Sequence, residues 1–324
     1  MESIAKVGPV MPDFAKLRSS FAFILNVVVI DASLSVEVAP GYCLRRASDI
    51  EVDVIKSQLA SLVAPRAAKI YELVAEESGE SGPRFCYSPE RHKWRYNVIS
   101  FAGSNAGLLD VEFAASLLKN DLQVGFAFVQ MSKVAFGCLW NTAPLSAFFE
   151  EKFFPSPPTQ LTHSELLEIS ENHKLIKAIN PDHTHLLRAF EKFRDVKSLP
   201  RQSELVVIAL FSVIESLIAH NPKSTEIGDS LGHQLQAKMP LLTKRFQRPL
   251  SINEYFEPAS DTSLWKRLYE YRSKLVHGED SKIDGNLRLL RDRETIVSFL
   301  TEAVKLLLLL ALREPVLLTD LKNC

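Results

Sequence analysis

The sequence predicts an α+β fold in two parts, an N-terminal α/β domain with a mixed sheet and a C-terminal all-α helical bundle. Through residues 1–140, short apolar runs rich in Phe, Val and Ile alternate with segments of helical spacing. From residue 161 to residue 324, helical periodicity dominates. Residues 141–160 contain four prolines and are interpreted as a linker. The length of 324 residues also favours two domains, since one domain typically holds roughly 100 to 200.

The first elements of the N-terminal half are two predicted strands and a helix. Phe21–Ile30 is a buried strand by its composition, and Leu34–Val38 alternates apolar and polar residues as a second strand does. Ser48, followed three positions later by Glu51, forms a capping box that opens a helix with apolar residues at helical spacing.

The rest of the N-terminal half is predicted as strand, helix and two more strands. A polar stretch from Glu76 to Lys93 contains glycines and prolines and breaks the pattern. The elements expected after it are a strand at Tyr96–Phe101, a helix over Leu108–Leu117, and strands at Leu122–Val129 and Val134–Trp140. Gly103–Gly107 lacks the spacing of a phosphate-binding loop and is interpreted as an ordinary turn.

The second half opens with another capping box, formed by Thr162 and Glu165. Helical periodicity then predicts helices that run through Lys177 and over Asp182–Val196, Gln202–His220, Thr225–Phe246, Ser263–His277 and Arg293–Leu312. Asp182, His183 and His185 suggest a metal cluster, but no third histidine or cysteine is near in sequence. We interpret them as a helix start capped by Asp182 and expect no metal site.

Composition places the chain in the cytoplasm without a membrane partner. The 38 basic and 39 acidic residues nearly balance, which excludes a strongly basic nucleic-acid coat. The four cysteines show neither zinc-site nor disulfide-framework spacing, as is typical of a reducing compartment. The start of the chain lacks the order of a secretory signal. The apolar run Ala303–Leu312 is about half the length of a membrane span and is expected in the core.

Arg272 and His277 are the candidate catalytic pair of the sequence. They lie near the end of a predicted helix, and Gly278 is a natural helix stop. On an ideal helix their side chains point about 140° apart, so they do not converge within one unbroken helix. At the helix C-terminus the dipole favours a protonated imidazole, and a symmetric dimer would bring two such pairs into one cleft.

The segment Tyr271–Gly278 resembles the ribonuclease motif of the HEPN superfamily, and in particular its Apea-like branch. Leu210–Leu217, which contains Glu215, is similar to the second core helix of that family, and Leu231–Leu242 follows as a further helix. The resemblance covers residues 181–313. Two features depart from the family pattern: Ser273 stands where many members have Asn, Asp or His, and Gln236 and Lys238 stand where an arginine is expected.

The resemblance implies a homodimeric, metal-independent endoribonuclease that needs no cofactor and acts in bacterial antiphage defence or a toxin–antitoxin system. Arg272 would stabilise charge on the phosphoryl oxygens, His277 would move a proton, and Glu215 would orient one of them. Tyr271, Ser273 and Lys274 would contact the RNA substrate. The N-terminal domain would sense a trigger (a regulatory protein or a phage product), restrain the nuclease or select the RNA.

Other interpretations of the same residues stay open. The bundle is alternatively a non-catalytic dimerisation or partner-binding module, in which Arg272 is a surface residue and His277 a helix cap. Glu215 is alternatively a buried acid paired for structural reasons, and Tyr271 a core residue. A third possibility, a small-molecule sensor centred on the N-terminal domain, has no motif to support it.

Overall fold

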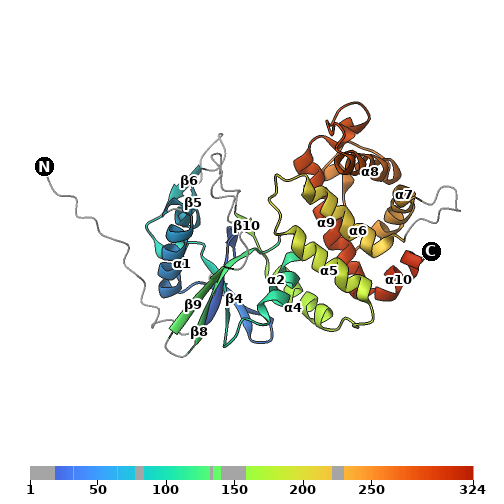
Figure 1. Cartoon of the computed structure of the whole chain (residues 1–324). Coiled ribbons are helices and arrows are strands. Elements are labelled where there is room, and N and C mark those ends of the chain that lie inside the picture. The colour runs from blue at the N-terminus through green and yellow to red at the C-terminus, as the bar shows by residue number, and fades with distance from the viewer. Residues whose placement is uncertain are drawn as a thin grey trace. The chain divides into compact units, whose positions relative to one another are not determined.

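The computed structural model describes residues 19–31, 33–63, 65–76, 84–131, 134–139, 158–220 and 230–323. The chain divides into two compact units, residues 1–173 and residues 174–324 (Figure 1). The first unit contains the sheet and the second is built from helices. The predicted α+β class is thereby confirmed.

The first unit is organised around a six-stranded sheet with the strand order β3-β4-β7-β1-β8-β9. Its strands are β1 (Ser20–Ile24), β3 (Ser35–Ala39), β4 (Tyr42–Arg46), β7 (Asn97–Phe101), β8 (Val124–Met131) and β9 (Val134–Leu139). Every pairing in this sheet is antiparallel, so the mixed sheet that the sequence predicts is wrong for it. All five residues of the inner strand β1 are buried, which means that both faces of the sheet are covered at this strand.

One face of the sheet packs against α1 (Asp49–Leu62) and the 3-10 helix η2 (Pro65–Glu72). The aromatic rings of this core interlock: the ring centroid of Phe23 lies 5.1 Å from that of Tyr71 and 5.2 Å from that of Phe126. Buried Tyr96 donates a hydrogen bond to the carbonyl of Ala68, 2.8 Å away. Burial of the aromatic surface is the main stabilising contribution here.

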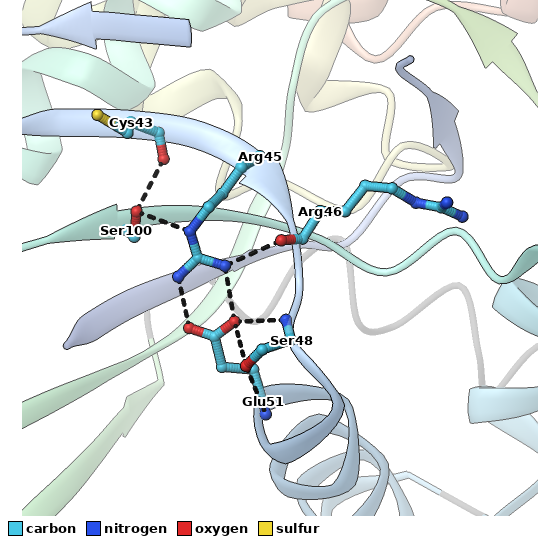
Figure 2. Close-up of polar contacts among 6 residues, drawn as sticks. All are labelled: Cys43, Arg45, Arg46, Ser48, Glu51 and Ser100. Atoms are coloured by element: carbon cyan, nitrogen blue, oxygen red, sulfur yellow. Dashed lines mark hydrogen bonds and ion pairs between the residues drawn. The ribbon is translucent and has the colours of Figure 1, made fainter. Parts of the chain in front are cut away.

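The predicted capping box at the start of α1 is confirmed, and it is part of a larger polar junction (Figure 2). Arg45 of β4 lies between the sheet and the helix, with Nη2 2.7 Å and Nη1 2.8 Å from the two carboxylate oxygens of Glu51. Its Nε donates to Ser100 Oγ of β7 at 3.2 Å. Burial raises the pKa of Glu51, but the bonds from Arg45 and Ser48 outweigh it and lower the pKa overall. The side chain of Arg46 points away from this junction.

The remaining elements of the first unit are short. They are the paired strands β5 (Leu73–Glu76) and β6 (Arg84–Tyr87), the strands β2 (Val28–Val29) and β10 (Thr159–Gln160), η3 (Arg91–Lys93) and α2 (Leu108–Ser116). The strand predicted at Phe21–Ile30 is split into β1 and β2. Between the two strands, the Asn26 side chain donates to Asp121 O and accepts from Gln123 N.

The boundary between the units falls later than the predicted linker. Residues 141–157 of that linker lie outside the described residues. Thr159–Gln160 pairs in parallel with Val28–Val29 of the first unit. The division lies within α4 (His163–Lys177), whose buried Asn172 donates to Ala114 O at 3.4 Å. The capping box at the start of this helix is confirmed by reciprocal bonds between Thr162 and Glu165.

The second unit is arranged around α6 (Leu205–Ile218), which is apolar on most of its surface and largely buried. This helix packs against α5 (Thr184–Val196), α7 (Leu231–Leu242), α8 (Asp261–His277), α9 (Arg293–Arg313) and α10 (Pro315–Asn323). The 3-10 helices are η5 (Thr243–Arg245), η6 (Ile252–Glu254) and η7 (Gly285–Leu290). The predicted helix at Thr225–Phe246 begins outside the described residues; within them, α7 starts after its N-cap Ser230.

Helix α9 is long and apolar enough to cross a membrane, but 72% of its most apolar window is buried inside the protein. Its polar residue Glu302 is engaged, since Arg248 donates to its Oε1 at 2.8 Å. We therefore assign α9 to the core of the helical unit, as the sequence predicts.

Candidate functional site

Helix α8 positions both Arg272 and His277. Its first turn is capped by Ser260, whose hydroxyl accepts a bond from the backbone. At its other end Gly278 adopts the left-handed conformation, with φ of 66°. The N–H of Glu279 donates back to Lys274 O at 3.0 Å, which closes the helix. The helix is therefore continuous through His277, its last residue.

Arg272 meets Glu215 between α8 and α6. Nη2 of Arg272 lies 3.3 Å from Oε1 and 3.4 Å from Oε2 of the glutamate. The two side chains are 19% and 16% exposed. This pair is looser than the bidentate Arg45–Glu51 pair of the sheet unit, in which both bonds are 2.8 Å or shorter.

The Glu215 carboxylate lies in a poorly solvated environment. Burial raises its pKa, and the cations of Arg272 and Lys192 only partly oppose this effect. Within the described residues, Oε1 of Glu215 and Nε of Arg272 are inaccessible to solvent and lack a hydrogen-bond partner. The pair thus retains unused hydrogen-bonding capacity, as is common at functional sites.

The ring of Tyr269 packs against the guanidinium of Arg272. The guanidinium carbon lies 5.6 Å from the centre of the Tyr269 ring, within the range of a cation–π interaction. The ring contacts Phe211 of α6 edge-on at 6.2 Å. On its α7 side it approaches Gly232 so closely that a Cβ there would lie 2.9 Å from the ring. Helices α6, α7 and α8 together fix the position of Arg272.

His277 does not join this pair within one chain. It is exposed, and within the described part of the chain it has no side-chain hydrogen bond or ion pair. It follows Arg272 by five positions on a continuous helix, a rise of about 7.5 Å and a rotation that leaves the side chains about 140° apart. The structure therefore brings Arg272 to Glu215 but leaves His277 on a different side of α8.

The three expected substrate-binding residues differ in exposure. Tyr271 is only 2% exposed, and burial raises the pKa of its hydroxyl, as does Glu204. Because its ring packs in the core, it offers no stacking surface, and we leave it out of the site. Ser273 and Lys274 are half-buried, and in the described residues neither side chain makes a hydrogen bond.

Lys238, one of the two departures from the family pattern, has a structural role. Its side chain is 7% exposed, and its ammonium donates to Ile218 O at 3.0 Å and to Leu321 O at 2.7 Å. These carbonyls lie at the C-terminal ends of α6 and α10, where a cation is favourable. Gln236 donates to Gly232 O within α7.

The described ranges contain no group of three or more His, Cys, Asp or Glu side chains placed to hold a metal ion. The ring centroids of His183 and His185 lie 6.2 Å apart. The predicted cap at Asp182 is wrong, because α5 begins at Thr184 and its N-cap residue is His183. The backbone N–H of Thr184 donates to the carbonyl of Asp182 at 2.9 Å, so Asp182 lies in the turn before the helix.

The chain matches no protein-family model, no curated protein and no solved structure.

Sequence reasoning misses Lys192, which lies beside the Glu215 site on α5. Its ammonium donates to the hydroxyls of Ser212 and Ser216, the α6 residues that flank Glu215. The sequence pattern that could have pointed to it is the spacing of His185, Arg188 and Lys192, which places three basic side chains on one face of a helix.

Proposed function

We propose that the helical unit is a HEPN-type endoribonuclease that cleaves RNA without a metal ion or cofactor. The observation that carries the proposal is the contact between Arg272 Nη2 and Glu215 Oε1, which are 3.3 Å apart. It joins α8 and α6, the two helices that contain the segments similar to the HEPN family. The carboxylate of Glu215 has a raised pKa, and the Tyr269 ring lies against the guanidinium of Arg272, which is the kind of environment found at functional sites.

The chemistry would be an internal transesterification. The ribose 2′-hydroxyl attacks the adjacent phosphorus, and the bond to the 5′-oxygen of the next nucleotide breaks. Arg272 would stabilise the charge on the phosphoryl oxygens, and Glu215 would orient its guanidinium. His277 would transfer a proton to or from the reacting oxygens. Ser273 and Lys274, half-buried beside Arg272, would contact the substrate.

A homodimer is part of this proposal because Arg272 and His277 diverge on α8. A second copy related by twofold symmetry would supply the histidine that one chain does not bring to its own arginine. Two exposed apolar residues support an interface near His277: Leu205 is 58% exposed and Val276 is 45% exposed. The hydrogen bond from Ser281 to Glu204, 3.4 Å long, ties the loop after α8 to the start of α6, where Leu205 lies.

The sheet unit is proposed to regulate the nuclease by sensing a regulatory protein or phage-derived trigger in the cytoplasm. Its polar junction at Arg45 is saturated by Glu51, Ser100 and the Arg46 carbonyl. A saturated junction is typical of a structural role. This leaves the chemistry to the helical unit, and antiphage defence or a toxin–antitoxin system is the proposed setting.

The test is cleavage of total RNA and transfer RNA by the purified full chain in EDTA, with and without phage lysate. Arg272→Ala and His277→Ala are expected to lower the rate at least 100-fold. The controls are Arg267→Ala, which removes an arginine paired with Glu270 on the same helix, and His163→Ala on α4. Absence of cleavage in every arm, together with an unchanged growth phenotype of His277→Ala, would overturn the proposal.

The second candidate is a non-catalytic dimerisation or partner-binding module. The separation of His277 from the Arg272–Glu215 pair within one chain favours it, as does Ser273. It predicts that the Arg272→Ala and His277→Ala proteins act in cells as the two control variants do. Strict dependence of the phenotype on either residue would exclude it.

A further inference from the structure

Helix α5 presents a row of basic side chains next to the proposed site. His185, Arg188 and Lys192 are spaced by three and four residues and so lie on one face. Arg188 and Lys192 are exposed, and His185 is half-buried with Nε2 3.4 Å from Thr319 Oγ1 of α10. The row therefore runs along the junction of α5 with α10.

A second lysine reaches the same place from α10. The Lys192 ammonium donates to Ser216 Oγ at 2.6 Å and to Ser212 Oγ at 2.9 Å. The Lys322 ammonium donates to Ser216 O, also at 2.6 Å. Two ammonium groups from different helices thus converge on Ser216. We call His185, Arg188, Lys192 and Lys322, with Ser212 and Ser216, the basic cluster.

Glu215 interacts with Lys192 through space but forms no ion pair with it in the described residues. Within the described ranges, no carboxylate forms an ion pair with Arg188, Lys192 or Lys322. Burial and the neighbouring cations Lys192 and Arg188 lower the pKa of Lys322. Burial, Lys322 and His183 likewise lower the pKa of His185. Uncompensated like charges repel, and an anion bound among them would relieve that repulsion.

The basic cluster continues to the Arg272 site through α6. Glu215 directly precedes Ser216, and it feels the cations of both Arg272 and Lys192. The positive groups thus lie on α5, α8 and α10 around α6 instead of surrounding one point. A linear polyanion fits this distribution better than a single small anion does.

We propose that the basic cluster binds the phosphodiester backbone of the RNA strand that reaches Arg272, an inference that rests on the proposed ribonuclease function. Ammonium and guanidinium groups bind phosphate oxygens without reading bases. The cluster would therefore position the strand and leave sequence choice to other contacts.

The experiment measures binding of the full chain to a 2′-O-methyl RNA oligonucleotide, which lacks the attacking hydroxyl and is not cleaved. The Lys192→Gln/Lys322→Gln double variant is compared with wild type and with Lys244→Gln/Lys266→Gln. The control removes two exposed lysines that make no described hydrogen bond or ion pair with the cluster. Because this assay measures binding and not cleavage, it tests the basic cluster even if the chain cleaves no RNA.

The cluster variant is expected to bind about tenfold more weakly at low salt, with the slope of log K against log salt reduced by about 1.4, or about 0.7 per lost phosphate contact. The control double variant should retain both values. Equal slopes and affinities in cluster variant and wild type would overturn the proposal. A second outcome would also overturn it. If inorganic phosphate raises the Tm of wild type but not that of the cluster variant, while both bind the oligonucleotide equally, the cluster holds a small phosphate instead of an RNA backbone.

Discussion

Arg272 and Glu215 are 57 positions apart in the sequence, and Nη2 of the arginine lies 3.3 Å from Oε1 of the glutamate. The contact joins α8 to α6, the central helix of the helical unit. Its counterpart in the sheet unit, Arg45 with Glu51, is shorter, bidentate and saturated. The two arginine–glutamate pairs therefore differ in geometry, and the looser pair is the one that the proposed nuclease would use.

The Arg272–Glu215 contact is expected to show a modest coupling in a double-mutant cycle. Arg272→Gln, Glu215→Gln and the double variant would be unfolded in urea at pH 7. We expect a coupling free energy of about 1 kcal/mol, because the pair is mostly buried but its bonds are long. A coupling below about 0.3 kcal/mol would show that the two residues do not interact in solution.

Glu215 is expected to destabilise the fold as its carboxyl loses a proton. Burial raises its pKa in the folded protein above the ordinary value of 4.5. The folded state then holds the proton more tightly, so the stabilisation is complete below pH 4.5 and is lost as the pH rises through the folded pKa. The difference in unfolding free energy, wild type minus Glu215→Gln, should therefore decrease as the pH is raised from 4.5 to 7. A rise over this window would contradict the assignment.

Glu51 should respond to pH in the opposite direction. Arg45 and Ser48 overcome the effect of burial and lower its pKa below 4.5, so its stabilisation is present above that pH and is lost as the pH falls through the folded pKa. Glu51→Gln should cost about 2–3 kcal/mol at pH 7, because it leaves Arg45 without its charged partner and weakens the capping box. Urea unfolding tests this against Glu90→Gln, an exposed glutamate paired with Lys93, whose effect should be much smaller. Equal effects of the two variants would refute the structural role of the junction.

Lys238 is expected to hold α10 against the rest of the helical unit. Lys238→Met would leave the carbonyls of Ile218 and Leu321 without this donor, at a cost of about 2–4 kcal/mol. Hydrogen exchange should accelerate first in α10. The exposed Lys244→Met serves as the control, and undisturbed exchange in α10 of the Lys238 variant would rule the role out.

Several elements of the fold were predictable because their signals are local. The capping boxes at Ser48 and Thr162 start helices where the sequence places them. Strand β4 was not predicted, because Tyr42–Arg46 lacks alternation and is held in place by its pairing with β3 and β7. Helix α10 was also missed: Pro315 reads as a helix stop, yet proline is well tolerated at the first position of a helix.

The candidate site was predictable to a lesser extent. The motif resemblance singles out Arg272 and Glu215, and the helical rotation predicts that His277 diverges from Arg272. The convergence of Lys192 and Lys322 on Ser216 was beyond sequence reasoning, since it depends on how α5 and α10 pack around α6. The core position of Tyr271 was the alternative that helical spacing favoured, and its burial confirms it.

The most direct test of the central claim is the chemistry of the RNA ends that the purified chain produces in EDTA. The proposal predicts 2′,3′-cyclic phosphate and 5′-hydroxyl ends, no cleavage where a single 2′-deoxy nucleotide replaces the ribose that supplies the attacking hydroxyl, and loss of the products in His277→Ala. Cleavage that persists at the 2′-deoxy position, or that His277→Ala leaves unchanged, would contradict the account.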